Sequence, residues 1–241
     1  MKIKVFHHIL LENHWYSIVK EQYRLIKESG MLDEIDEFYI TLSYLENNKK
    51  NKIIEIFYDR IYNFIYEDEF FYNKKVNIIE HKKEEFEYPT LEKAVEISKE
   101  NQDFIGFYLH TKGSANLSTD NEMMRESLNE GCINYWREHT SAIKEDYDMS
   151  GINLVYKNPN VIMGEPATKY YKTFYSGNFF FFSPNFFKEV DFSKVDKKIR
   201  YYAESIYGLI YNPKFNNVGY IHPKMTFLKT GNIKIKDESD I

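Results

Sequence analysis

The sequence predicts an α/β protein with a mostly parallel central sheet flanked by helices. Over the first 110 residues, segments of strand character alternate with segments of helical character, which is the pattern of a parallel sheet. The last of these strands, residues 103–110, is apolar almost throughout, as a strand buried on both faces must be. Only ten glycines and six prolines occur in 241 residues, so we expect no flexible linker between domains.

Three earlier strands are expected from their composition. Residues 2–9 are rich in Ile, Val and Phe, and we interpret this opening segment as a strand rather than a signal peptide. Residues 37–43 and 75–80 have the same β-branched and aromatic character. Neighbouring residues of a strand point to opposite faces, so His7 and His8 are not expected to face one site together.

The helices between these strands follow from apolar spacing. Residues 14–29 place apolar side chains at helical intervals, and Gly30 is a typical helix stop. Residues 53–66 are expected to form the second helix. Thr90 is expected to cap the third, whose apolar face begins at Leu91.

The second half is less regular. Residues 121–145 and 197–210 have helical spacing, and residues 171–183 form an apolar, aromatic-rich segment. Residues 234–241 are polar and are expected to fray.

Charge and cysteine content exclude several classes of protein. The 32 basic and 37 acidic residues give a net charge of −5, which argues against broad nucleic-acid binding. The single cysteine, Cys132, excludes an intramolecular disulfide and fits a reducing compartment such as the cytoplasm. No apolar run approaches the roughly 20 residues that span a bilayer.

Polar residues follow the apolar strand at residues 103–110. Open α/β sheets bind ligands beyond the carboxyl ends of their strands, and here the strand ends in His110, Thr111, Lys112 and Gly113. Lysine offers a compact positive charge, and glycine lets backbone N–H groups approach a ligand closely. These residues could form an anion or diphosphate site; the alternative is a polar turn after a core strand.

A second polar turn precedes another apolar strand. Tyr175-Ser-Gly-Asn178 is followed by Phe179-Phe-Phe-Phe-Ser183. The Asn178 amide can donate and accept hydrogen bonds, which suits sugar hydroxyls. The alternative is a hairpin turn that leads into a core strand.

Together these two segments resemble a known family. Tyr108-Leu-His-Thr-Lys-Gly-Ser114 and Tyr175-Ser-Gly-Asn-Phe179 resemble the paired YLHTKG and FSGNFWW motifs of small GT-A-like proteins from bacterial and viral surface-polysaccharide gene sets. The resemblance extends loosely over residues 3–227. It departs at Phe180 and Phe181, where the family often has Trp.

The resemblance implies a glycosyltransferase that moves a sugar from a nucleotide-diphosphate sugar to a capsule- or lipopolysaccharide-type glycan. It implies a single GT-A-like, Rossmann-like domain over residues 1–241, with a donor-binding half at 1–113 and an acceptor half at 114–233. Its partners would be the nucleotide sugar and the glycan acceptor, with at most peripheral membrane contact and no nucleic acid.

Site residues are assigned on the same basis. The donor and its diphosphate are expected to contact His8, Glu80, Glu87, Thr90, His110, Thr111, Lys112 and Gly113. The acceptor sugar is expected to contact Trp136, Arg137, Ser176, Gly177 and Asn178. The candidates for the base that takes the acceptor proton are Glu204, Asp148 and His110.

No cofactor is firmly implied, and a divalent metal is possible but not favoured. GT-A enzymes typically place an Asp-x-Asp metal site at the end of a central strand, but the turn at His110–Lys112 carries no carboxylate. We therefore expect Lys112, helped by His110, to stabilise the leaving diphosphate in place of a metal. Asp146 and Asp148 match Asp-x-Asp by letters, but they follow a predicted helix end rather than a strand.

Two other classes of function stay open. A non-catalytic nucleotide- or glycan-binding module, derived from such a transferase, would explain the missing Asp-x-Asp. Another transferase on an α/β sheet, such as a nucleotidyl- or methyltransferase, is the second class. A methyltransferase would need a glycine-rich loop after the first strand, and His7-His-Ile-Leu10 lacks one, which counts against it.

Overall fold

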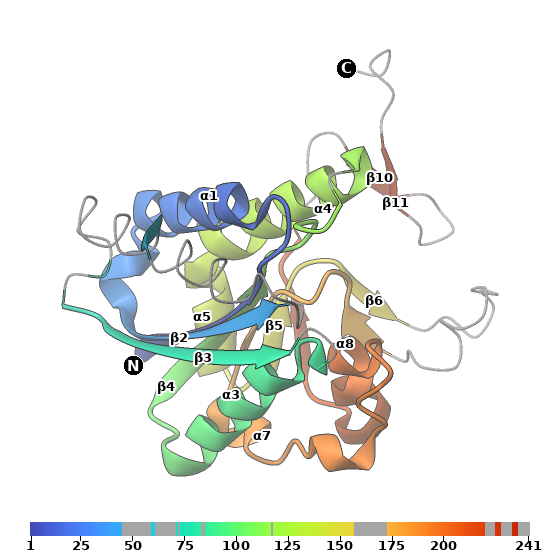
Figure 1. Cartoon of the computed structure of the whole chain (residues 1–241). Coiled ribbons are helices and arrows are strands. Elements are labelled where there is room, and N and C mark those ends of the chain that lie inside the picture. Colours follow the sequence, from blue (N-terminus) through green and yellow to red (C-terminus); the bar gives the residue numbers. More distant parts are fainter. Residues whose placement is uncertain are drawn as a thin grey trace.

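The computed structural model has the expected α/β fold, with a central sheet between two layers of helices (Figure 1). It describes residues 1–44, 59–60, 71, 73–82, 85–116, 118–156, 173–219, 225–227 and 233–235. Most of the helix expected over residues 53–66, and the tail expected to fray after residue 235, lie outside these described residues.

Seven strands form the central sheet, in the order β3-β2-β1-β4-β8-β5-β9. They are β1 (Lys2–Leu10), β2 (Ile35–Tyr44), β3 (Lys75–Lys82), β4 (Phe104–His110), β5 (Met149–Gly151), β8 (Phe180–Phe182) and β9 (Phe215–Asn217). The first four confirm the expected strands and pair in parallel. β8 is antiparallel to both of its neighbours, and β5 and β9 are parallel. Both halves of the chain thus contribute to one sheet.

Other described strands form two small antiparallel pairs. β6 (Leu154–Tyr156) pairs with β7 (Thr173–Tyr175), and β10 (Met225–Phe227) pairs with β11 (Ile233–Ile235).

Helices cover both faces of the sheet (Figure 1). One face packs against α1 (Trp15–Glu28), α4 (Thr119–Asn129) and α5 (Trp136–Lys144). The other packs against α3 (Tyr88–Glu100), α7 (Pro184–Phe187) and α8 (Tyr202–Ile206). The short helical turns are η1 (Met31–Glu34), η3 (Glu130–Asn134), η4 (Phe192–Lys194) and η5 (Tyr207–Tyr211).

The aromatic run at β8 is explained by burial on both faces. Phe179 and Phe181 belong to the core on the α1 side, whereas Phe180 and Phe182 belong to the core on the α3 side. All four are fully buried, and burial of each phenylalanine stabilises the fold by roughly 1.5–3 kcal/mol. A strand with two buried faces has no place for alternating polar residues.

Adjacent residues of β1 also point to opposite faces, as predicted. The His7 Nδ1 atom contacts the Tyr23 hydroxyl of α1 at 3.1 Å, whereas the His8 Nδ1 atom contacts the Thr90 hydroxyl of α3 at 3.3 Å. Only His8 lines the cleft described below.

Two expectations about helices were wrong in detail. Thr90 does not cap α3, because the helix begins earlier at Tyr88 with Pro89 in its first turn, a position that suits proline. Thr90 is instead buried within the helix. The helix expected over residues 121–145 is divided into α4 and α5 by the π-helical turn η3.

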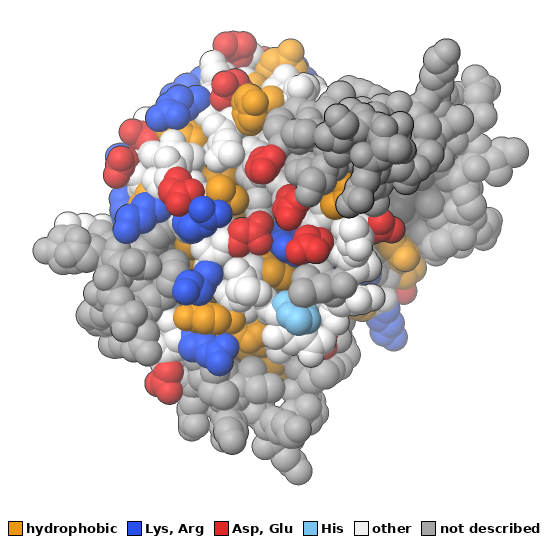
Figure 2. Space-filling model, turned by 90° about the horizontal axis from the view of Figure 1, so that it is seen from above, with side chains coloured by type: hydrophobic (Ala, Val, Ile, Leu, Met, Phe, Trp, Pro, Cys, Tyr) orange, Lys and Arg blue, Asp and Glu red, His pale blue; other side chains and the backbone are white. Residues whose placement is uncertain are grey.

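The described surface carries mixed charges. On the face seen from above, basic and acidic side chains lie close to one another (Figure 2). Among the described residues, no helix has the length and apolar character needed to cross a membrane.

Candidate functional site

A cleft of about 300 Å³ opens at the carboxyl ends of β1, β2 and β4. β2 and β3 lie on one side of β1 in the sheet, whereas β4 lies on its other side, so the direction in which strands are added reverses at β1. This is the switch point where open α/β sheets bind ligands. The residues that line the cleft are His8, Leu10, Ser43, Phe86, Glu87, His110, Thr111, Lys112, Gly113, Ser114, Ala115, Asn116, Asn121 and Arg200.

Beside this cleft the structure brings together the two segments that the sequence singled out. The His110 Nε2 atom lies 2.9 Å from the Gly177 carbonyl oxygen. The next residue, Asn178, donates its side-chain amide to Glu87 at 2.5 Å. Gly177 and Asn178 therefore support the wall of the cleft from behind, and neither lines it.

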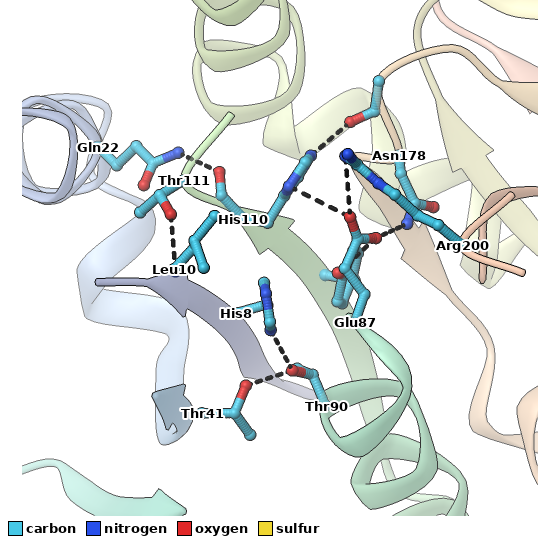
Figure 3. A network of polar contacts seen from close by, with 12 residues as sticks. His8, Leu10, Gln22, Thr41, Glu87, Thr90, His110, Thr111, Asn178 and Arg200 are labelled. Atoms are coloured by element: carbon cyan, nitrogen blue, oxygen red, sulfur yellow. Dashed lines mark hydrogen bonds and ion pairs between the residues drawn. The ribbon is translucent and has the colours of Figure 1, made fainter. Parts of the chain in front are cut away.

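Glu87 is the centre of a buried polar network. Asn178, His110 and Arg200 converge on its carboxylate (Figure 3). The Tyr108 hydroxyl also donates to it, at 3.0 Å. Burial by itself disfavours the charged form, but the charges of His110 and Arg200 and the Asn178 amide outweigh burial and lower the pKa of Glu87 to about 2. Glu87 is thus a permanent negative charge beneath the cleft.

Both ring nitrogens of His110 contact protein oxygens. A carbonyl oxygen can only accept, so Nε2 donates its proton to Gly177. Nδ1 lies 3.5 Å from the Glu87 carboxylate. Burial lowers the pKa of His110 to about 4, although Glu87 opposes the shift. Nε2 is bonded to Gly177, and Nδ1 faces the Glu87 carboxylate, so the geometry assigns His110 to positioning rather than to base catalysis.

The turn after β4 is attached to the end of β1. The Thr111 amide donates to the His8 carbonyl at 3.1 Å, and the Thr111 hydroxyl accepts from the Leu10 amide at 3.0 Å. Gly113 has a φ of 85°, a left-handed conformation that favours glycine. This attachment fixes the backbone on both sides of Lys112.

Several polar groups of the cleft lack a partner in the described part of the chain. Lys112 forms no ion pair with any described residue. The hydroxyl oxygens of Ser43 and Ser114 are buried and form no hydrogen bond among the same residues. Buried polar atoms are normally hydrogen-bonded, so groups such as these indicate a place for a polar ligand. A cation and hydroxyl donors are suited to an anion.

Glu204 is a titratable carboxylate near the cleft, although it is not among the residues that line it. It lies in α8 and is half-buried. Burial and the charge of Glu87 raise the pKa of Glu204 to about 7, while Lys112 and Arg200 act in the opposite direction. A carboxylate with such a pKa can accept and release a proton near neutral pH.

A second polar cluster lies at the β2 side of His8. Thr90 contacts both His8 and the hydroxyl of Thr41 (Figure 3). The rings of His8 and His81 are 5.3 Å apart. Glu80 is exposed and does not line the cleft. At this strand end, therefore, His81 and not Glu80 lies beside His8, although His81 itself does not line the cleft.

Four further residues assigned to the site are not brought to the cleft. Asp148 precedes β5, which runs in the same direction as β4, so it lies at the end of the sheet away from the cleft, where its carboxylate accepts the Lys214 amide at 2.8 Å. Trp136 is buried and donates to the Ser29 carbonyl beyond the end of α1, and Arg137 stacks on it. The Ser176 amide donates to the Asn153 carbonyl, and its side chain does not line the cleft.

Sequence reasoning missed Arg200, Phe86 and Asn121, which all line the cleft. Arg200 belongs to a charged stretch that is typical of a solvated helix face. Phe86 and Asn121 carry no local signal. Each reaches the cleft only through packing of elements that are distant in sequence.

The lining residues do not fit a divalent cation well. In the described ranges, no group of three or more His, Cys, Asp or Glu is placed to hold a metal ion. Both oxygens of Glu87 already have partners, and Lys112 and Arg200 repel a further cation.

No protein-family model matches this chain, and a search of curated proteins finds no significant match.

Proposed function

We propose that this protein is a glycosyltransferase that transfers a sugar from a nucleotide-diphosphate sugar to a hydroxyl of a glycan acceptor. The observation that carries the proposal is the cation Lys112 in the cleft, with the Glu204 carboxylate of α8 close enough for the two charges to interact. Lys112 has no carboxylate partner among the described residues, and Glu204 has a pKa of about 7. Transfer to a hydroxyl needs both a positive charge for the leaving group and a base for the acceptor.

The proposed reaction is a single displacement. The Glu204 carboxylate takes the acceptor hydroxyl proton, and the acceptor oxygen forms a bond to the anomeric carbon. The bond between that carbon and the diphosphate oxygen breaks, and its electron pair stays on the nucleoside diphosphate. Lys112 stabilises the charge that develops there. Attack opposite to the leaving group inverts the anomeric centre.

The acceptor and location rest on the resemblance of Tyr108–Ser114 and Tyr175–Phe179 to the surface-polysaccharide family. We propose a capsule- or lipopolysaccharide-type acceptor and a cytoplasmic site of action, with peripheral contact to the inner face of the membrane. A growing glycan on a lipid carrier would be accessible there.

The first experiment is a thermal-shift screen of nucleotides and nucleotide sugars, with and without a chelator. A ligand that binds only the folded protein raises its apparent stability. We expect one nucleotide class to shift the wild type in the presence of chelator. The shift should be lost in Lys112→Ala and kept in Lys144→Ala, an exposed lysine that does not line the cleft.

Two outcomes would contradict the proposal in different ways. A shift that requires a divalent metal would refute the metal-independent role of Lys112. No shift with any nucleotide would refute the donor site and favour a glycan-binding module, which immobilised glycans would then test.

A further inference from the structure

Arg200 is a second cation at the cleft, and it is only loosely held. Its side chain is 49% exposed, and its Nη2 atom lies 3.9 Å from the Glu87 carboxylate. It lines the same cleft as Lys112. Figure 3 shows the guanidinium beside Glu87, on the side where Asn178 also approaches.

Glu87 does not depend on Arg200 for its hydrogen bonds. The Asn178 amide and the Tyr108 hydroxyl donate to the carboxylate at 2.5 Å and 3.0 Å. The Arg200 contact is longer than either, at 3.9 Å. The guanidinium can therefore turn toward a ligand without leaving a buried carboxylate unpaired, which is the costly outcome when an ion pair is broken.

The backbone beneath Arg200 is nevertheless fixed. The buried Tyr88 hydroxyl of α3 donates to the Ile199 carbonyl at 2.7 Å. Lys197 pairs with Glu92 on the same helix. Arg200 thus combines an anchored main chain with a side chain that is half-exposed.

We propose that Arg200 is the second cation of a two-cation site that binds the β-phosphate of a nucleoside diphosphate, together with Lys112. Guanidinium groups bind phosphate through two parallel hydrogen bonds, which lysine cannot provide. This inference rests on the proposed function, in which Lys112 stabilises the leaving diphosphate, and Arg200 lines the same cleft as Lys112. The β-phosphate carries the charge that develops when its bond to the anomeric carbon breaks. The site is therefore specific for diphosphates over monophosphates.

The test measures dissociation constants by calorimetry for UDP, CDP, GDP and ADP, the matching monophosphates and inorganic pyrophosphate. The proteins are wild type, Arg200→Ala, Arg200→Lys and Arg24→Ala, an exposed arginine of α1 outside the cleft. We expect Arg200→Ala to weaken binding of the preferred diphosphate about tenfold or more. Its monophosphate should change less than twofold, and Arg200→Lys should be intermediate. Arg24→Ala should match the wild type.

Each alternative result has a defined meaning. If the wild type binds a diphosphate and Arg200→Ala binds it within twofold, the two-cation inference is wrong and the donor site stands. If diphosphate and monophosphate weaken equally, Arg200 does not act on the β-phosphate, and the inference is also wrong. If the wild type binds no nucleotide and no pyrophosphate, both proposals fail. Arg200-dependent binding of pyrophosphate alone would keep the anion site but refute the nucleotide donor.

Discussion

His110 and Gly177 are 67 residues apart in sequence, yet the imidazole Nε2 lies 2.9 Å from the glycine carbonyl oxygen. The next residue along the turn, Asn178, donates to Glu87. Two successive residues of one turn therefore contact the end of β4, at His110, and the start of α3, at Glu87. This turn fixes the shape of the cleft wall, so we expect substitutions of Gly177 and Asn178 to destabilise the fold.

Gly177→Ala should destabilise the protein. Gly177 has a φ of 89°, and an added Cβ would lie 2.5 Å from the Leu128 Cδ1 atom. Strain and overlap should together lower the free energy of unfolding by about 1–3 kcal/mol, as measured by urea denaturation. Gly219→Ala is the matched control, because no atom of the described residues lies within 4 Å of its added Cβ. Equal stability of the two variants would contradict this packing.

Asn178→Asp should place a second carboxylate against Glu87. Asn178 is buried, has a φ of 55° and donates to Glu87 at 2.5 Å. Loss of that donor and like-charge repulsion should destabilise the fold by roughly 2–4 kcal/mol at pH 7. Asn212→Asp makes the same change at an exposed residue with a φ of 49°, where water screens the added charge, and should cost far less. Equal melting temperatures for both variants would rule out the Asn178–Glu87 bond.

Glu204 should set the pH dependence of transfer. Its pKa of about 7 means that the carboxylate form needed in a base appears as the pH rises through neutrality. We expect kcat/KM for donor cleavage to increase with pH up to a plateau above about pH 8. Glu204→Gln should lower kcat by about 100-fold or more, with the donor dissociation constant nearly unchanged. A rate that falls as the pH rises through 7 would indicate an acid and not a base.

His139 should make the fold sensitive to acid. Its buried ring contacts the Ser150 hydroxyl at 2.9 Å and the Gly131 carbonyl at 3.0 Å, an arrangement that suits the neutral form. Burial lowers its pKa from 6.5 to about 4. Between pH 6.5 and pH 4 the unfolded chain binds this proton more readily than the folded protein does. The free energy of unfolding is therefore at its full value above pH 6.5 and falls by about 3 kcal/mol in total toward pH 4.

The check is denaturant unfolding from pH 7 to pH 4. His139→Gln should be less stable than wild type at pH 7 but should lose less stability on acidification. His14→Gln, at an exposed histidine, controls for the substitution itself. An identical pH slope in wild type and His139→Gln would show that His139 does not contribute to acid sensitivity.

The sequence by itself determined the local elements and the chemistry of one strand end. Alternation of apolar segments predicted β1 to β4, because side-chain periodicity is a property of neighbouring residues. The rule that ligands bind at carboxyl ends of strands correctly placed His110 to Gly113 at the cleft. It could not separate Glu80 from His81, because the face of a strand that meets the ligand depends on which helix covers it.

Only the tertiary structure decided which distant residues meet at the site. Arg200 reaches the cleft because its segment is attached to α3 through Tyr88. Asp148 is excluded because it lies at the amino end of β5, at the end of the sheet away from the cleft. Glu87 carries no local signal of burial in the sequence, yet once the sheet is assembled Asn178 and Tyr108 donate to its carboxylate, and His110 and Arg200 lie close to it. Such contacts come from non-local packing, and electrostatic shifts depend on burial and on neighbours across space, which no sequence spacing encodes.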